Sequence, residues 1–257
     1  TWDASRLVVH VKPDGNEAED GLTWPSARAT IGSAIEVATS TADTAILGAR
    51  GGEIWVAGGS YAGAVEVPAF VQLYGGFDGT EENRYERDFN INETTLDGGG
   101  EVSVVRFGNS GYRVSRLDGF VVQNGGLYRA GLFSTNLADY KLGQGGGILS
   151  WVGGPEIVNN LVQQNAVGNP YSALYPEFER GGGIAGFVST AVLRGNTIQD
   201  NEVWDNEDGR GGGVYFQKSA PMILSNTIQR NHAENGAGIY IDGDAQTRSY
   251  VGQNRIE

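Results

Sequence analysis

The stretch GQGGGILSW at residues 143–151 decides the fold, because two close copies follow it along the chain. The copies are ERGGGIAGF at 179–187 and GRGGGVYFQ at 209–217, and NGAGIYIDG at 235–243 is a weaker version. A motif that recurs in register indicates a repeating scaffold, and such repeats have to be identified before any local structure is assigned.

Asparagines follow each glycine triplet at fixed intervals. Thirteen residues after the third glycine comes one asparagine, and five residues later comes a second. The third glycines are Gly147, Gly183 and Gly213, the first asparagines are Asn160, Asn196 and Asn226, and the second are Asn165, Asn201 and Asn231. A fourth copy places Asn254 in the first column, and LDGFVVQNG, ending at Asn124, is an earlier degenerate copy.

The segment between the second asparagine and the next triplet has no fixed length. It spans residues 166–180, then 202–210, then 232–235. Fixed apolar segments that alternate with variable polar loops are typical of a solenoid whose insertions lie on one side. The recurring glycines and asparagines disfavour helix, and the β-branched residues between them suit a pleated surface.

These features predict a parallel β-helix, with coils stacked about 4.8 Å apart and identical residues aligned in ladders. Asparagine at a coil corner tolerates left-handed backbone geometry and bonds to its copies above and below. We therefore expect the two asparagine columns to form two ladders with a structural role. The three glycines are expected to let the chain turn out of each loop and into the next strand.

The pattern GGG-I followed by P-x-I-x-x-N-x-I-x-x-N resembles right-handed parallel β-helix repeat proteins, above all the polymorphic-outer-membrane-protein type of repeat. The N-terminal half of the chain also resembles the start of large secreted or cell-surface members of this group. The segments that carry this resemblance are DGLTWPSARATIGSAIEVA (20–38), GGEIWVAGGSYAG (51–63), VQLYGGFDGTEENRYERD (71–88) and TTLDGGG (94–100). The resemblance implies a right-handed coil and a large secreted or cell-surface protein. It does not specify activity, because one fold carries many functions.

The N-terminal region is expected to cap the first coil of the β-helix. Apolar residues from Ile31 to Ala38 follow a helical spacing, with Thr30 as the N-cap, and a helix there would cover the open end of the first coil. We expect one β-helix domain over 1–257, with a cap region at 1–50, irregular coils at 51–124 and regular coils at 125–257. Because no comparable cap precedes Glu257, we expect either further coils beyond it or a partner chain over that end.

Composition narrows the classes of partner. Asp and Glu outnumber Lys and Arg by 31 to 18, for a net charge of −13, which argues against nucleic acid and anionic membrane surfaces. No apolar stretch approaches the roughly 20 residues of a membrane span, so this segment is not expected to insert into a membrane. With no cysteine, disulfides and thiolate metal sites are excluded.

The triplets do not fit a phosphate-binding loop, because a strand rather than a helix is expected after each and no Lys follows them. If the protein is an enzyme, its site is expected on the flank that carries the long loops. Arg180 and Arg210 occupy the same column directly before their triplets. A β-helix lyase would need an arginine or lysine as base beside carboxylates that hold calcium or neutralise a uronate, whereas a hydrolase would need two or three close carboxylates. The alternative is that each arginine pairs with nearby acidic loop residues.

Aromatic residues in the loops are candidates for ligand contact, because rings beside polar groups suit sugar faces and protein interfaces alike. The candidates are Tyr171, Tyr175 and Trp204, together with the two arginines. Trp151 and Phe187 share one coil position, in the core or on a face. The loop WDNEDGR (204–210) is a calcium candidate through Asp205, Glu207 and Asp208. His10 and His232 lie far apart in sequence and suggest no site.

Three functions remain open. The leading hypothesis is a non-catalytic extracellular or cell-surface scaffold that binds glycan or other proteins through the loop-lined flank. The second is a polysaccharide lyase or glycoside hydrolase that acts in the same flank. The third is a structural subunit of a filament or surface layer, joined end to end through open coil ends.

Overall fold

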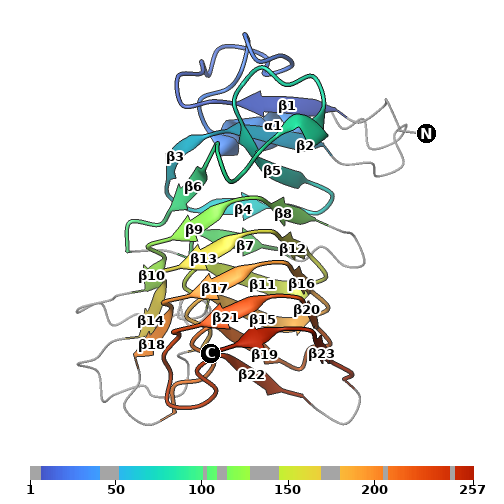
Figure 1. Cartoon of the computed structure of the whole chain (residues 1–257). Coiled ribbons are helices and arrows are strands. Elements are labelled where there is room, and N and C mark those ends of the chain that lie inside the picture. Colours follow the sequence, from blue (N-terminus) through green and yellow to red (C-terminus); the bar gives the residue numbers. More distant parts are fainter. Residues whose placement is uncertain are drawn as a thin grey trace, which may run out of the picture.

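The protein folds as a parallel β-helix, which confirms the predicted fold (Figure 1). The computed structural model describes residues 7–40, 52–100, 103–108, 115–127, 145–168, 180–204, 208–243 and 247–257. All strand pairs are parallel, and the strands form four sheets, here named A to D.

Sheets A and B run the length of the molecule. Sheet A contains β1 (Val8–Val11), β2 (Glu53–Ala57), β5 (Gln72–Phe77), β8 (Arg116–Asp118), β12 (Glu156–Val158), β16 (Val192–Arg194), β20 (Met222–Leu224) and β23 (Tyr250–Gly252). Sheet B contains β3 (Gly59–Ala62), β6 (Thr94–Asp97), β9 (Val121–Gln123), β13 (Leu161–Gln163), β17 (Thr197–Gln199), β21 (Thr227–Gln229) and β24 (Arg255–Ile256).

Sheets C and D complete the coils. Sheet C contains β4 (Val65–Val67), β7 (Val105–Phe107), β11 (Ile148–Gly153), β15 (Ile184–Ser189), β19 (Val214–Gln217) and β22 (Ile239–Asp242). Sheet D contains β10 (Gly126–Leu127), β14 (Ala166–Gly168) and β18 (Glu202–Trp204). A regular coil therefore passes through sheets A, B and D, and reaches sheet C after the variable loop.

The interior is a stack of aliphatic columns. In sheet A, Ile157 pairs with Leu193, which pairs with Ile223, and all three are fully buried. Val162, Ile198 and Ile228 form the matching column in sheet B. These are the apolar positions that the repeat predicted, and burying a side chain of this size stabilises the fold by about 1.5–3 kcal/mol.

Both predicted asparagine ladders are present. Nδ2 of Asn160 donates to Oδ1 of Asn196, Asn196 donates in the same way to Asn226, and Asn226 to Asn254, over 2.9–3.1 Å. The second ladder joins Asn165 to Asn201 and Asn201 to Asn231 over 2.9–3.0 Å. Each Oδ1 also accepts from the backbone N–H of the residue at the same position one coil earlier, which is an asparagine except at the start of each ladder; Asn196 N to Asn226 Oδ1 is an example. The buried amides therefore have partners on both sides, as buried polar groups require.

The ladder asparagines do not themselves adopt the left-handed backbone conformation. That conformation falls on the residue before each of them, for example Asn159 (φ 55°) before Asn160 and Gln164 (φ 55°) before Asn165. In the degenerate copy, Asn124 (φ 53°) occupies the left-handed position, and Gly125 stands where the ladder asparagine would be. Gly125 N donates to Asn165 Oδ1, so the second ladder ends on a backbone group.

The three glycines of a triplet serve different purposes. Gly181 has a left-handed backbone (φ 70°) and makes the turn that the sequence predicted. A Cβ on Gly182 would meet the carbonyl oxygen of Glu202 at 2.5 Å, and one on Gly183 would meet that of Gly213 at 2.6 Å. Only the first glycine is needed for its conformation, whereas the other two allow close backbone approach.

The predicted cap helix is α1 (Ile31–Ser40), and the Thr30 hydroxyl accepts from Ser33 N at 3.3 Å, as an N-cap does. Ile31, Ala34 and Ala38 are buried in the main core beside β1 and β2. A short 3-10 helix, η1 (Arg84–Glu86), lies in the loop after β5. Within the described part of the chain, no helix has the length and hydropathy needed to cross a membrane.

Candidate functional site

The loop-bearing flank is formed where sheet D meets the glycine triplets. The variable segments leave the coil after sheet D and return at Arg180 and Arg210, directly before the triplets. The second glycine of the first two triplets lies against the backbone of sheet D, since a Cβ on Gly146 would come within 2.9 Å of Ala166 O and one on Gly182 within 2.5 Å of Glu202 O. The two ends of each insertion are therefore held together, which explains why loop length varies without disturbing the coils.

Arg180 and Arg210 lie side by side in this flank and share one counterion. They form a parallel bridge one coil apart. Nη2 of Arg180 lies 3.1 Å from Oδ2 of Asp208, and Arg210 contacts both carboxylate oxygens of Asp208 at 2.7 Å. The structure thus brings together Arg180 and Arg210, which were predicted to bind a ligand, and Asp208, which was predicted to bind a metal. Both arginines form ion pairs with Asp208.

The ion pairs hold Arg210 in its charged form. The side-chain hydrogen bond to Asp208 raises the pKa of Arg210, because it is made to the protonated guanidinium. Each arginine also faces a tyrosine of the next coil, with Arg180 6.0 Å from the ring centre of Tyr215 and Arg210 5.1 Å from that of Tyr240. These distances are within the range of cation–π attraction.

Aromatic rings continue from these tyrosines across the outer face of sheet C. Trp151, Phe187, Tyr215 and Tyr240 follow one another with ring centres 5.3–5.8 Å apart. Trp151 and Phe187 therefore lie outside the coil rather than in its interior. Phe187 and Tyr215 are buried, at 5% and 1% exposure, so the stack is not an open platform along its length.

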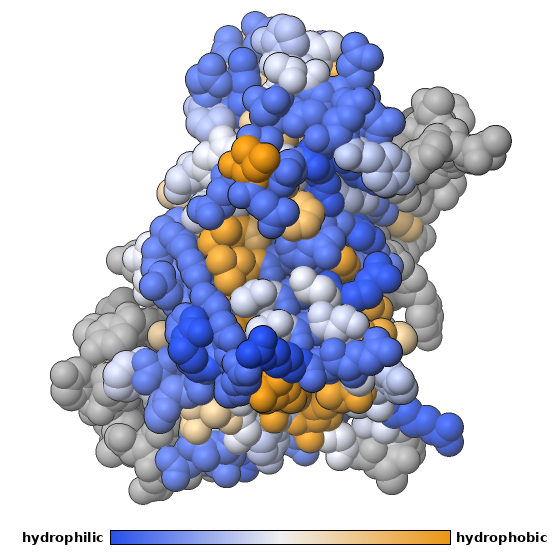
Figure 2. All heavy atoms as spheres, viewed as in Figure 1, coloured by the Kyte–Doolittle hydropathy of each residue, from blue (hydrophilic) through white to orange (hydrophobic). Residues whose placement is uncertain are grey.

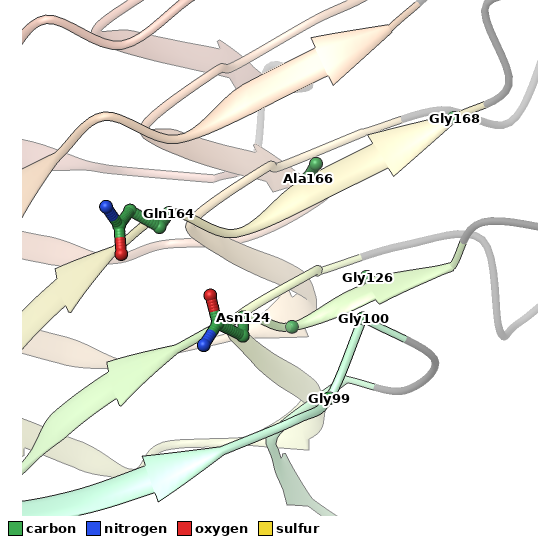
Figure 3. Close-up of a pocket in the computed structure, with 8 residues that line it drawn as sticks. Gly99, Gly100, Asn124, Gly126, Gln164, Ala166 and Gly168 are labelled. Carbon is green, nitrogen blue, oxygen red and sulfur yellow. The ribbon is translucent and has the colours of Figure 1, made fainter.

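A pocket of about 520 Å³ opens beside sheet D, between β10, β14 and the turn after β6 (Figure 3). Its described lining consists of Gly99, Gly100, Asn124, Gly125, Gly126, Gln164, Ala166 and Gly168. Asn124 donates through Nδ2 to Asp97 at 2.7 Å, whereas the side-chain amide of Gln164 makes no hydrogen bond to the described residues. The described lining offers amides and backbone groups, which form hydrogen bonds without titrating.

Trp204 lies next to this pocket. It pairs in sheet D with Gly168, which lines the pocket, and the Trp204 side chain is 42% exposed. No contact joins Trp204 to Arg180 or Arg210 in the described structure. Tyr171, Tyr175, Asp205 and Glu207 lie outside the described residues, so the predictions for them remain predictions.

The calcium prediction also remains a prediction. Asp208 directs both oxygens to arginines, and an ion there would have to compete with these bonds. Among the described residues, no group of three or more His, Asp or Glu side chains is placed to hold a metal ion.

Sequence reasoning missed a charged cluster on the outer face of sheet A. The loop after β5 lies over this sheet and contributes Arg84 and Arg87. Arg87 pairs with Asp118 at 2.7 Å, and Arg116 contacts both Asp118 and Glu156. Tyr74 is buried in the middle and lies beneath Arg84, whose guanidinium is 4.5 Å from the ring centre.

This cluster holds the loop after β5 against the outer face of sheet A, and we call it the clamp. Arg84 also pairs with Glu53, so carboxylates of the sheet balance the arginines. Arg87 Nη1 additionally donates to the carbonyl oxygens of Gly75 and Asp118. The irregular coils carry no repeat, and only the arginines of RYER (84–87) signal the contact in the sequence.

Comparison with known proteins adds no functional assignment: the chain matches no protein-family model, no curated protein and no solved structure.

Proposed function

We propose that the protein is a non-catalytic binding scaffold that recognises glycan through the flank formed by sheet D and the glycine triplets. The observation that carries the proposal is the amide-lined pocket with the exposed indole of Trp204 in the adjoining coil. Small-ligand sites typically combine a small number of polar groups with an aromatic surface. Amides donate and accept together, as sugar hydroxyls do, and an indole packs against the apolar face of a sugar ring.

The rigid coil supports this role. Both pocket amides project from left-handed corner residues, Asn124 and Gln164, on neighbouring coils. The backbone N–H groups of Phe120 and Gly125 donate to Oδ1 of Asn160 and Asn165, and these bonds help to fix the spacing of those two coils. A site on such a scaffold is ordered before the ligand arrives, which reduces the entropic cost of binding.

The arginine pair favours binding over lyase chemistry in the same flank. A lyase base has to accept a proton at its working pH. Arginine is protonated near neutral pH, and the hydrogen bond from Arg210 to Asp208 stabilises the protonated form further, raising the pKa.

The extracellular or cell-surface location is part of the proposal. It is supported by the resemblance of the GGG-I and asparagine pattern to the polymorphic-outer-membrane-protein type of repeat. Surface labelling of intact cells that express the full gene product, compared with labelling after lysis, tests this location.

A glycan array probed with the purified chain tests the binding function. We expect retention on a subset of glycans, weakened by Trp204→Ala and Gln164→Ala. Tyr250→Ala and Gln253→Ala are matched controls, because Tyr250 is an exposed ring on sheet A and Gln253 is a corner glutamine with the same left-handed backbone. Retention on surface proteins with no glycan bound would favour a protein partner instead.

Incubation with uronic and neutral polysaccharides tests the enzymatic alternative. Unsaturated products or new reducing ends that disappear in Arg210→Ala would establish catalysis in the flank and overturn the non-catalytic proposal.

A further inference from the structure

A second cavity, of about 660 Å³, lies at the N-terminal end of the molecule, on the outer face of sheet A. Its walls are the segment after β1 and the loop after β5, which lie at the same end of the coil stack (Figure 1). The innermost lining includes His10, Trp24 and Trp55, each no more than 8% exposed. The volume is within the range of small-ligand sites.

The two walls are joined and internally braced. Nε1 of Trp24 donates to the carbonyl oxygen of Glu81 at 3.0 Å and so connects one wall to the other. The Glu81 carboxylate accepts from the backbone N–H groups of Asp78, Gly79 and Thr80. The cavity is thus held open by the fold, and a ligand would need to order little of it.

His10 presents an unused acceptor in this cavity. Its Nδ1 lies 3.0 Å from the carbonyl oxygen of Gly21, which can only accept, so Nδ1 carries the proton. Nε2 is then an acceptor, and none of the described residues donates to it. Burial lowers the pKa of His10, which keeps the ring neutral near pH 7. The ring meets Trp24 and Trp55 edge to face, with centres 4.6 and 5.5 Å apart.

The charged groups of the cavity are also acceptors. Its described lining contains Glu81 and Glu82 and neither Lys nor Arg. The Glu82 carboxylate makes no hydrogen bond or ion pair with the described residues. The side-chain donors of the lining are already in use. The Trp24 and Trp55 indoles donate to Glu81 and Glu53, and the hydroxyls of Thr80 and Thr23 bond to Asp78 and Ser26.

We propose that this cavity binds a primary ammonium group, carried either on a lysine side chain or on an amino sugar. An ammonium has three donors and no acceptor, which complements His10 Nε2 and the Glu82 carboxylate. Tryptophan is also the aromatic side chain that attracts cations most strongly. A neutral sugar fits less well, because its hydroxyls would find acceptors but no free donor. The inference does not rest on the glycan binding proposed for the flank formed by sheet D and the glycine triplets.

Calorimetric titration of the whole chain tests the proposal with four probes. The charged probes are N-acetyl-lysine methylamide and glucosamine, and the neutral ones are N-acetyl-norleucine methylamide and N-acetylglucosamine. We expect saturable binding of at least one charged probe and none of its neutral counterpart up to about 10 mM. Binding of the lysine probe alone identifies a protein segment as the source, and binding of glucosamine alone identifies an amino sugar.

Two variants place the binding in this cavity. Glu82→Gln is expected to weaken the charged probe about fivefold, as for loss of one partly exposed ion pair, and Glu82→Lys is expected to abolish binding. Glu36→Gln and Glu36→Lys, on the exposed side of α1 and outside the cavity lining, are matched controls and should bind as the wild type does. Absence of binding by both charged probes, equal binding of the neutral probes, or an unchanged affinity in Glu82→Lys would overturn the proposal.

Discussion

Arg87 and Asp118 form a buried ion pair, 2.7 Å between Nη2 and Oδ1, that fastens the loop after β5 to the outer face of sheet A. Asp118 is 3% exposed and also accepts from Arg116. Removing one partner of such a pair leaves buried charge uncompensated. The contact therefore controls the stability of the irregular coils.

We predict that Asp118→Ala lowers the free energy of unfolding by about 3–4 kcal/mol, because Arg87 and Arg116 lose their shared counterion. Urea unfolding followed by circular dichroism measures the change. Asp200→Asn is the control, because the Asp200–Arg230 pair has the same 2.7 Å separation but is exposed, and asparagine tolerates the left-handed backbone of this position (φ 55°). Loss of this exposed pair should cost about 0–1 kcal/mol. Equal losses of unfolding free energy in the two variants would show that the buried Asp118 pair contributes no more to stability than the exposed Asp200 pair.

The same carboxylate should make stability depend on pH. Burial opposes ionisation of Asp118, but Arg87, Arg116 and Asn159 outweigh it, and the pKa lies below its ordinary value. A carboxyl whose pKa is lower in the folded state contributes stability above its unfolded pKa of about 3.9, and the contribution is lost as pH falls through the folded pKa. The difference in unfolding free energy between wild type and Asp118→Asn should therefore be constant from pH 5 to 7 and shrink below about pH 4. A difference independent of pH down to about 2 would rule out this linkage.

Replacing an asparagine in the middle of a ladder should cost more stability than replacing one at its end. Asn196→Ala removes an Oδ1 that accepts from Asn160 and an Nδ2 that donates to Asn226 and to the carbonyl oxygen of Ile157. Since these groups are buried, we expect a loss of about 2–3 kcal/mol. Asn254→Ala, in the same column but half-buried, is the control and should cost less. Thermal unfolding of both variants decides the point, and a larger effect at Asn254 would contradict it.

The triplet glycines should tolerate no side chain. In Gly183→Ala the new Cβ would lie 2.6 Å from Gly213 O and 3.0 Å from Asn201 Nδ2, which forces two coils apart. We expect a loss of more than about 2 kcal/mol, as for overpacking against backbone. Gly32→Ala is the control: a Cβ there meets nothing within 4 Å, and alanine should stabilise α1 by about 0.5–1 kcal/mol. A melting temperature for Gly183→Ala equal to that of the wild type would refute the close-approach explanation.

The regular coils were predictable because their chemistry repeats. Ile157, Leu193 and Ile223 recur at one position, and so do the ladder asparagines, so that the sequence shows pairing as well as strands. The degenerate copy was harder, since Asn124 resembles a ladder residue but occupies the corner before it. Only the backbone pairing of β9 with β13 reveals that shift.

The first coils and the flank were less predictable. His10 and Trp24 meet through a turn that follows no repeat, and Arg87 reaches Asp118 across 31 residues. In the flank, the column of Arg180 and Arg210 was visible in the sequence, but their shared partner Asp208 lies in a variable loop. The pocket beside sheet D had no signal at all, because glycine backbone and corner amides form it.

The most direct test of the binding scaffold is the affinity of wild type, Trp204→Ala and Tyr250→Ala for the glycan that the array retains most strongly, measured by calorimetry. We predict that Trp204→Ala weakens binding about tenfold, which corresponds to about 1.4 kcal/mol for the lost contact of one ring, and that Tyr250→Ala leaves it unchanged. Equal affinity of the wild type and Trp204→Ala, or failure of the wild type to bind any glycan, would contradict the account.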